Sequence, residues 1–255
     1  AQSESSNQKQ VPNASNTAAQ PAQSTETESV LSLIERFSDH LPNQLSIGNA
    51  HPDVFRKIKG NIINSMGTFL QQEIASFNAL ILRMKSSLQN LKKALNGTVV
   101  MNTELEAMFN SFRNSQVPSI WSSIAYPSQL SLADWFENLT QRVSMIQLWI
   151  RSGQPNIFWL GAFFFPQGLL TSVLQTFARK YKIPIDRLDF KTIPLSEIPE
   201  EAPKDGIIIE KLFMEGASWN FEKQTLRDAK QGEIFTTMPL IHLVPIEKEH
   251  LQKER

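Results

Sequence analysis

Ile157-Phe158-Trp159-Leu160-Gly161-Ala162-Phe163-Phe164-Phe165-Pro166-Gln167-Gly168-Leu169-Leu170 is the stretch around which this chain is organised. No charged side chain occurs between Arg151 and Arg179, so the segment is expected to exclude water from the surfaces that it contacts. It holds four Phe and one Trp, and each ring buries roughly 150–250 Å² when it is packed. The sequence therefore predicts an extended aromatic segment, closed by Pro166, that leads into an amphipathic helix at the centre of a domain.

A membrane span is an alternative for the same stretch, because it is strongly apolar. Gly161, Pro166, Gln167 and Gly168 interrupt it, however, and a helix that crosses a bilayer needs roughly 20 consecutive apolar residues. These interruptions favour a packed core segment over membrane insertion of residues 157–178. We therefore expect no membrane partner.

The composition limits the classes of function. Lys and Arg together number 25, as do Asp and Glu, and the sequence pI is about 7.2, so neither nucleic acid nor an anionic membrane surface is an expected partner. The absence of cysteine rules out disulfides, thiolate catalysis and Cys-based zinc sites, and it is consistent with a reducing compartment. The first residues lack the apolar region of a signal peptide, and a first residue other than Met is typical of a fragment or processed chain.

The chain begins with a polar segment that is followed by a short helix. Residues 1–29 consist almost entirely of Gln, Ser, Asn, Thr, Ala, Glu and Pro, a composition that cannot bury enough apolar area to offset its ordering entropy. We therefore expect residues 1–29 to be disordered. Next comes an amphipathic helix that Pro42 ends, with apolar positions at Val30, Leu31, Leu33, Ile34, Phe37 and Leu41.

A long helix is predicted beyond a loop at residues 43–53. Its apolar positions alternate spacings of four and three: Leu70, Ile74, Phe77, Ile81, Met84, Leu88, Leu91 and Leu95. This seam is followed by Gly97, a residue type that commonly ends helices. A free coiled-coil dimer is an alternative, but the neighbouring helices are short and need a partner, which favours one helix of a packed bundle.

Two further helices are predicted before the aromatic segment. Thr103 and Glu106 have the spacing of a capping box at the start of one helix. Ser131 and Asp134 have the same spacing at the start of the other, which Gly153 ends. The second helix has a seam of its own: Leu132, Phe136, Leu139, Val143, Ile146 and Ile150. Together these helices describe a bundle.

The sequence pattern changes after Pro184, which ends the helix that follows the aromatic segment. Short apolar runs are separated there by Pro and Gly: Leu188, Phe190, Ile207–Ile209, Leu212–Met214, Ile234–Phe235 and Leu240–Val244. Such runs are typical of strands in a small antiparallel sheet or barrel. The predicted fold class is α+β, with an N-terminal α-helical bundle followed by a small antiparallel β-sheet or partial β-barrel.

The sequence nominates no catalytic, cofactor-binding or metal-binding residue. It contains no GxxxxGK(S/T) loop to hold phosphates, no GxGxxG and no Gly-x-Ser-x-Gly elbow. Its four histidines are scattered, which argues against a metal site: His40, His51, His242 and His250.

Two clusters of charge are explained by exposure to solvent. Glu197, Glu200 and Glu201 lie among prolines, as in a solvated loop. A basic cluster is typical of the solvent-exposed face and the C-terminal end of a helix: Arg179, Lys180 and Lys182. The residues by themselves indicate a non-catalytic packing or docking module.

Four segments resemble, in order and spacing, the C-terminal domain of dynein heavy chains. The first is Leu91–Gly97, with Val99–Met101 and Glu104–Glu106 after it. The others are the aromatic segment Phe158–Gln167 with Leu170, Thr171 and Phe177–Lys180, then Leu212–Trp219, then Met238–Pro245. The resemblance covers roughly residues 60–245, and residues 30–45 look like the last helix of the sixth AAA+ module. The FFFPQ and LF-EGA-W forms are more similar to axonemal than to cytoplasmic heavy chains.

The resemblance implies a helical bundle and a small β-barrel that lie across one face of a motor's six-module AAA+ ring. It implies that the parent heavy chain hydrolyses ATP and moves toward microtubule minus ends, in the cytoplasm and cytoskeleton and specifically in the axoneme of a cilium or flagellum. The implied partners are the AAA+ ring of the same heavy chain, dynein intermediate and light chains, and microtubules. ATP and Mg belong to the AAA+ modules, so we expect this chain to need no cofactor and to be no enzyme by itself.

These expectations divide the chain into five parts. They are a disordered tail (1–29), the terminal helix of the sixth AAA+ module (30–48), the helical bundle of the C-terminal domain (49–184), a small β-barrel subdomain (185–246) and a charged tail (247–255). The first part has no recognised counterpart in the family, and family members continue beyond Pro245, which leaves closure of the barrel open. The expected function is regulation of the motor by packing on its ring. The alternative is a free-standing helical scaffold that reuses the module to bind partners.

Overall fold

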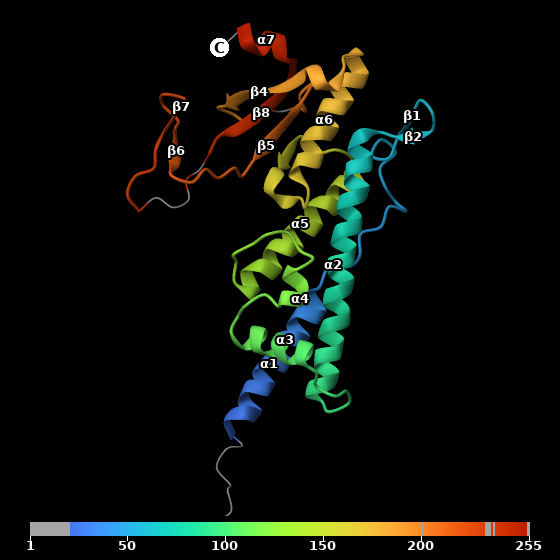
Figure 1. Ribbon diagram of the computed structural model, residues 1–255, viewed down its shortest axis with the longest axis vertical. Helices are drawn as coiled ribbons and strands as arrows, with labels where there is room; N and C mark the ends of the chain where they lie inside the picture. The colour runs from blue at the N-terminus through green and yellow to red at the C-terminus, as the bar shows by residue number, and fades with distance from the viewer. Residues whose placement is uncertain (1–20, 200, 233–235, 237, 254–255) are drawn as a thin grey trace, which may run out of the picture.

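The computed structural model describes residues 21–199, 201–232, 236 and 238–253, and the fold is α+β, which confirms the predicted class (Figure 1). Two parts can be distinguished in Figure 1. The helical body comprises α1 to α5, and the sheet lobe comprises everything from β3 to α7. One hydrophobic core runs through both parts, because sheet residues such as Ile207 and Ile241 belong to the same buried cluster as the helical seams.

The predicted long helix is α2 (Ser65–Leu95), which runs along most of the molecule (Figure 1). Its seam is buried from Leu70 to Leu91 and packs inside the bundle, against α1, α3 and α6. Asn64 caps its start, since Asn64 Oδ1 accepts the Gly67 N–H at 2.7 Å. Gly97 follows its end with φ +73°, as expected for the left-handed residue beyond a helix C-terminus.

Helix α1 (Pro21–His40) begins nine residues before the predicted start at Val30. The disorder predicted for residues 21–29 is therefore wrong. The helix is longer because it continues alongside α3 (Thr103–Arg113), where Glu26 Oε2 lies 3.4 Å from Arg113 Nη1. The remainder of the predicted tail, residues 1–20, lies outside the described residues.

The capping box predicted at Thr103 does not form, because the N-cap is one residue earlier. Asn102 is the N-cap of α3, and its Oδ1 accepts the Leu105 N–H at 2.9 Å. The cap of α5 (Leu132–Ser152) is as predicted, because Ser131 Oγ accepts the Asp134 N–H at 3.4 Å. Gly153 ends α5 with φ +94°.

A short helix, α4 (Ser119–Ser122), places a tryptophan in the core of the helical body. Trp121 is 0% exposed, and its Nε1 donates to Ser87 Oγ at 2.8 Å. Its ring is stacked on Trp135 with centroids 6.0 Å apart. These rings form the aromatic centre of the helical body, which Tyr126 connects to Phe164 of the aromatic segment.

The aromatic segment is extended at its start, as predicted, but turns in its middle, and it joins the two parts. It forms β3 (Ile157–Trp159), a 3-10 turn (Leu160–Ala162) and the start of α6 (Pro166–Tyr181). Pro166 is the first residue of α6, where a missing N–H has little cost. Burial of the rings is uneven, because Phe158 is 1% exposed whereas Phe165 is 53% exposed.

The main sheet has the strand order β3-β5-β8-β4, with β4 (Leu188–Leu195), β5 (Ile207–Glu210) and β8 (Leu240–Glu247). Strand β8 is antiparallel to β4 and β5, but β3 is parallel to β5. The predicted antiparallel sheet is thus wrong in one respect: the aromatic segment supplies an edge strand, and the connection through α6 allows a parallel pairing. Within the described residues this sheet is open and does not close into a barrel.

The strand predicted at Leu212–Met214 is absent, because Lys211 adopts φ +55° and turns the backbone out of β5. The backbone then forms a separate hairpin of β6 (Ala217–Asn220) and β7 (Thr225–Asp228). The predicted run at Ile234–Phe235 lies outside the described residues.

The ends of the sheet lobe and of α2 carry small additional elements. Most of the charged tail forms a helix, α7 (Lys248–Lys253), and Lys248 Nζ donates to Asp186 O at 2.7 Å. A ribbon of β1 (Lys57–Ile58) and β2 (Ile62–Ile63) precedes α2. Across the described ranges, none of the helices has the length and apolar character needed to cross a bilayer.

Candidate functional site

The aromatic segment packs into a set of rings on α2 and α5. Phe158 lies edge-on to Trp149, with centroids 5.2 Å apart, and Phe163 also contacts Trp149, at 6.1 Å. Phe164 lies edge-on to Phe77 of α2, at 4.8 Å. Edge-to-face pairs of this kind add stability beyond the area that they bury. The turn at residues 160–165 is therefore held by two helices of the helical body.

A buried carboxylate fixes the backbone of that turn. Glu73 is 0% exposed, and its two oxygens accept the N–H groups of Phe164 and Phe165 at 2.8 and 2.9 Å. These residues directly precede Pro166, so the carboxylate lies at the positive end of the α6 dipole. Burial raises the pKa of Glu73, and the two N–H bonds and the nearby Arg142 charge oppose this rise.

A buried guanidinium holds the other side of the turn. Arg142 of α5 is 8% exposed, and its Nη1 donates to Gly161 O at 2.6 Å while its Nε donates to Asn138 Oδ1 at 2.7 Å. The guanidinium carbon lies 3.6 Å from the ring centre of Tyr126 and 5.1 Å from that of Trp159. Burial lowers the pKa of Arg142, but a guanidinium remains charged at neutral pH.

Tyr126 provides an aromatic face and not a reacting hydroxyl. Burial raises the pKa of Tyr126 to about 12, so its phenol is protonated at neutral pH. Its Oη has no hydrogen-bond partner in the part of the sequence that the structure describes. Both oxygens of Glu73 are already bonded to the backbone. Glu73, Arg142 and Tyr126 are named here the Glu73–Arg142 clamp, whose two charged groups bind the backbone of Gly161, Phe164 and Phe165.

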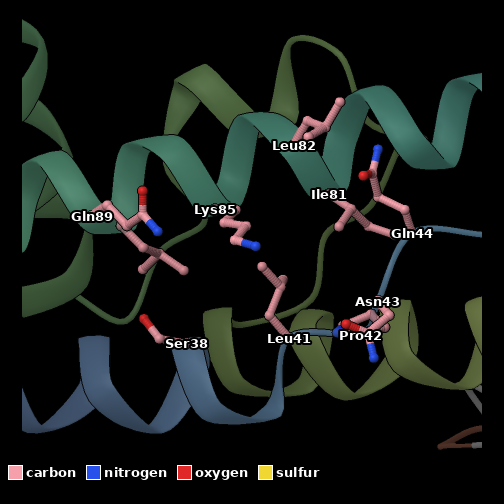
Figure 2. Close-up of a pocket in the computed structure, with 10 residues that line it drawn as sticks. Ser38, Leu41, Pro42, Asn43, Gln44, Ile81, Leu82, Lys85 and Gln89 are labelled. Atoms are coloured by element: carbon pink, nitrogen blue, oxygen red, sulfur yellow. The ribbon is translucent and has the colours of Figure 1, made fainter.

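A groove lies between α1 and α2, the helix that also supplies Glu73 (Figure 2). Its volume is about 230 Å³, which is below the roughly 300–1,000 Å³ of typical ligand pockets. In Figure 2, Lys85 of α2 and Leu41, which directly follows α1, point toward one another across it. Among the described residues that line the groove, Lys85 alone is charged, so no acid and base are paired there.

The structure keeps the four histidines apart. His40 Nδ1 lies 2.8 Å from Arg36 O, and His242 Nε2 lies 2.9 Å from Asp205 O, so both have partners in the backbone. No group of three or more His, Asp or Glu that could hold a metal ion occurs among the described residues. The prediction that the protein has no catalytic, cofactor or metal residue remains a prediction.

The basic cluster at the end of α6 does more than face solvent. Arg179 Nη1 donates to Ser65 Oγ at the start of α2, at 2.7 Å. Lys180 Nζ donates to Asp205 Oδ1, also at 2.7 Å, which attaches α6 to the loop before β5. Glu197 and Glu201 are exposed, and Glu200 lies outside the described residues.

Glu73 and Arg142 were not nominated by the sequence. Each stands beside a seam residue, Ile74 and Val143, on a helix whose neighbouring positions are buried. A charge beside a seam is the signal that could have found them, because such a side chain must be paired when it is buried.

The Glu73–Arg142 clamp joins the helical body to the sheet lobe, and the whole is a domain of the α+β class. The family model that matches residues 3–255 is that of the C-terminal domain of dynein heavy chains. The protein belongs to this family, which confirms the resemblance. The match includes most of the polar segment at residues 1–29, for which no counterpart was recognised.

Curated relatives agree with the family match. The sequence is 36% identical over 241 residues to dynein axonemal heavy chain 6 of Homo sapiens, an alignment that covers 86% of this chain and 6% of the relative. It is 42% identical over 193 residues to human dynein axonemal heavy chain 1, covering 74% of this chain and 4% of the relative. For human dynein axonemal heavy chain 12 the identity is 36% over 226 residues, with 88% and 7% covered. The chain thus spans less than a tenth of the length of these relatives.

Proposed function

We propose that this chain is the non-catalytic C-terminal region of a dynein heavy chain, which packs on the AAA+ ring and regulates an ATP-driven motor directed to microtubule minus ends. The match to the C-terminal domain family over residues 3–255 carries the proposal. The clamp supports it, because its two charged side chains are bonded to the backbone of the aromatic segment and hold the fold together. The axonemal names of the relatives indicate the cytoskeleton and the axoneme of a cilium or flagellum as the location.

The proposed partners follow from the parent complex. They are the AAA+ ring of the same heavy chain, dynein intermediate and light chains, and microtubules. The parent would bind ATP and Mg in its AAA+ modules, and this chain would bind neither. Regulation would act by packing, because the domain adds a rigid body to one face of the ring.

The test compares the full-length heavy chain with a form that ends before residue 49. We expect truncation to change the ATPase rate and the velocity of microtubule gliding, and residues 1–255 expressed separately to hydrolyse no ATP. Equal rates and velocities for the two forms would contradict regulation. A reading frame with no AAA+ modules upstream of this sequence would instead favour the free-standing scaffold.

A further inference from the structure

The sequence contains one Asn-Gly pair, Asn96-Gly97, which directly follows α2. An asparagine before glycine loses its side-chain amide readily, because glycine has no Cβ to hinder attack of its backbone nitrogen on the asparagine Cγ. Asn96 and Gly97 are both exposed, and a Cβ added at Gly97 would meet nothing within 4 Å. The pair is therefore open to solvent at the end of a helix.

The amide of Asn96 is free to move, unlike those of other asparagines in the helical body. Asn64 and Asn78 are bonded to the backbone through both the oxygen and the nitrogen of their amides. In the part of the chain that the structure describes, the Asn96 amide has no hydrogen-bond partner. The Gly97 N–H donates to Ala94 O at 3.0 Å, but this bond belongs to the last turn of a helix, where helices fray.

We propose that Asn96 is a site of spontaneous deamidation. The Gly97 nitrogen forms a bond to Asn96 Cγ, and the amide group leaves as ammonia together with the proton of the Gly97 N–H. One water molecule then opens the cyclic imide to aspartate or isoaspartate. Neither step oxidises or reduces the chain. The product carries a carboxylate in place of a neutral amide.

The new carboxylate lies beside a lysine that holds α1. Asn96 N–H donates to Lys92 O at 3.1 Å, and side chains four residues apart on a helix share a face. Lys92 Nζ is paired with Glu35 Oε1 of α1 at 2.9 Å. The carboxylate competes with Glu35 for Lys92, and it stands at the negative end of the α2 dipole. Deamidation therefore weakens the attachment of α1 to α2.

Peptide mass spectrometry of residues 1–255, incubated in mildly alkaline buffer, tests the site. Asn114 is the matched control, because it also caps the end of a helix and is exposed, with φ −90° and ψ 8° against φ −84° and ψ 6° at Asn96. The next residue, Ser115, has a positive φ as Gly97 has, but it carries a Cβ. We expect Asn96 to deamidate about tenfold faster than Asn114. Equal rates would overturn the proposal.

Hydrogen–deuterium exchange tests the effect on α1. We expect the amides of residues 26–40 to exchange about twofold faster in Asn96→Asp than in the wild type, the size of effect that one helical ion pair gives. Adding Lys92→Gln should leave no further effect of Asn96→Asp, because the lysine for which the two carboxylates compete is gone. Unchanged exchange in Asn96→Asp, or an equal effect of Asn96→Asp with and without Lys92, would overturn the competition for Lys92.

Discussion

The helical body and the β6–β7 hairpin use large apolar side chains in opposite ways. In the body, Trp121 is 0% exposed and Trp135 is 1% exposed, and they stack on each other. On the hairpin, Phe221 and Leu226 are each 52% exposed. Buried apolar area stabilises a fold at about 25 cal/mol per Å², whereas exposed area contributes to stability only when a partner covers it. The buried rings of the body therefore contribute to its stability, whereas the exposed side chains of the hairpin contribute little.

The largest expected effect is on the aromatic centre of the body. Trp121→Ala should lower the free energy of unfolding by about 3–5 kcal/mol, because it leaves a cavity and removes the donor to Ser87. Urea denaturation of residues 1–255 measures it. Leu148→Ala on the exposed face of α5 is the control and should cost under about 0.5 kcal/mol. Similar losses of unfolding free energy for the two variants would show that Trp121 does not lie in the core of the body.

The next prediction tests whether the sheet lobe is as closely packed as the helical body. Gly206 has φ +83°, and a Cβ there would collide with the carbonyl oxygen of Leu243. Gly206→Ala should lower the free energy of unfolding by about 3 kcal/mol, from left-handed strain and overpacking together. Gly216 has φ +72° with nothing within 4 Å, so Gly216→Ala should cost only about 1 kcal/mol. Equal losses of unfolding free energy in the two variants would show that β8 shifts at Leu243 to make room for the Cβ.

A smaller effect concerns the clamp that joins the two parts. Glu73→Ala removes the acceptor of two buried N–H groups, so it should cost about 1–3 kcal/mol in urea denaturation at neutral pH. Glu104→Gln, at an exposed ion pair with Arg83, is the control and should cost under about 1 kcal/mol.

The same variant gives a dependence on pH. Because burial raises the pKa of Glu73, the folded protein holds this proton more tightly than the unfolded protein. The contribution of Glu73 to stability is thus fully present below the unfolded pKa of about 4.3 and is lost as pH rises through the higher folded pKa. The stability difference between the wild type and the Glu73→Ala variant should therefore shrink as pH rises. A difference that grows with pH would mean that the two N–H bonds outweigh burial.

The smallest expected effect is on the hairpin. Leu226→Ser should change the free energy of unfolding of residues 1–255 by less than about 0.5 kcal/mol, because half of Leu226 is already in solvent. Thermal melting measures it beside Leu188→Ser, where the side chain is 3% exposed and the loss should be about 2 kcal/mol or more. A large loss for Leu226→Ser would place the hairpin in the core.

Local patterns predicted much of the helical body. The α2 seam, the Ser131 cap and the turn at Gly97 each depend on residues within a few positions, so apolar spacing and cap chemistry were sufficient. The cap at Asn102 was missed because Thr103 has the same chemistry one residue later. The start of α1 was missed because its contact with Arg113 comes from a distant part of the sequence.

The clamp and the sheet order could not be predicted in the same way. Glu73 bonds to backbone groups 91 and 92 residues away, and backbone N–H groups carry no signal in the sequence. The parallel pairing of β3 with β5 depends on how α6 packs on α2, which is a property of the whole fold. The aromatic segment was recognised as central, but the charges that hold it were not.

Ionic strength should affect the attachment of helix α1 more than the contacts at Glu73. Helix α1 is attached in part by ion pairs whose side chains are about half exposed: Lys92 with Glu35 at 2.9 Å and Arg113 with Glu26 at 3.4 Å. The Debye length falls from about 8 Å at 0.15 M salt to about 3 Å at 1 M, which screens exposed pairs and leaves buried ones nearly unchanged. Concentrated salt should therefore loosen α1 and leave the joint at Glu73 intact, so the outer edge of this domain responds to its ionic surroundings while its centre does not.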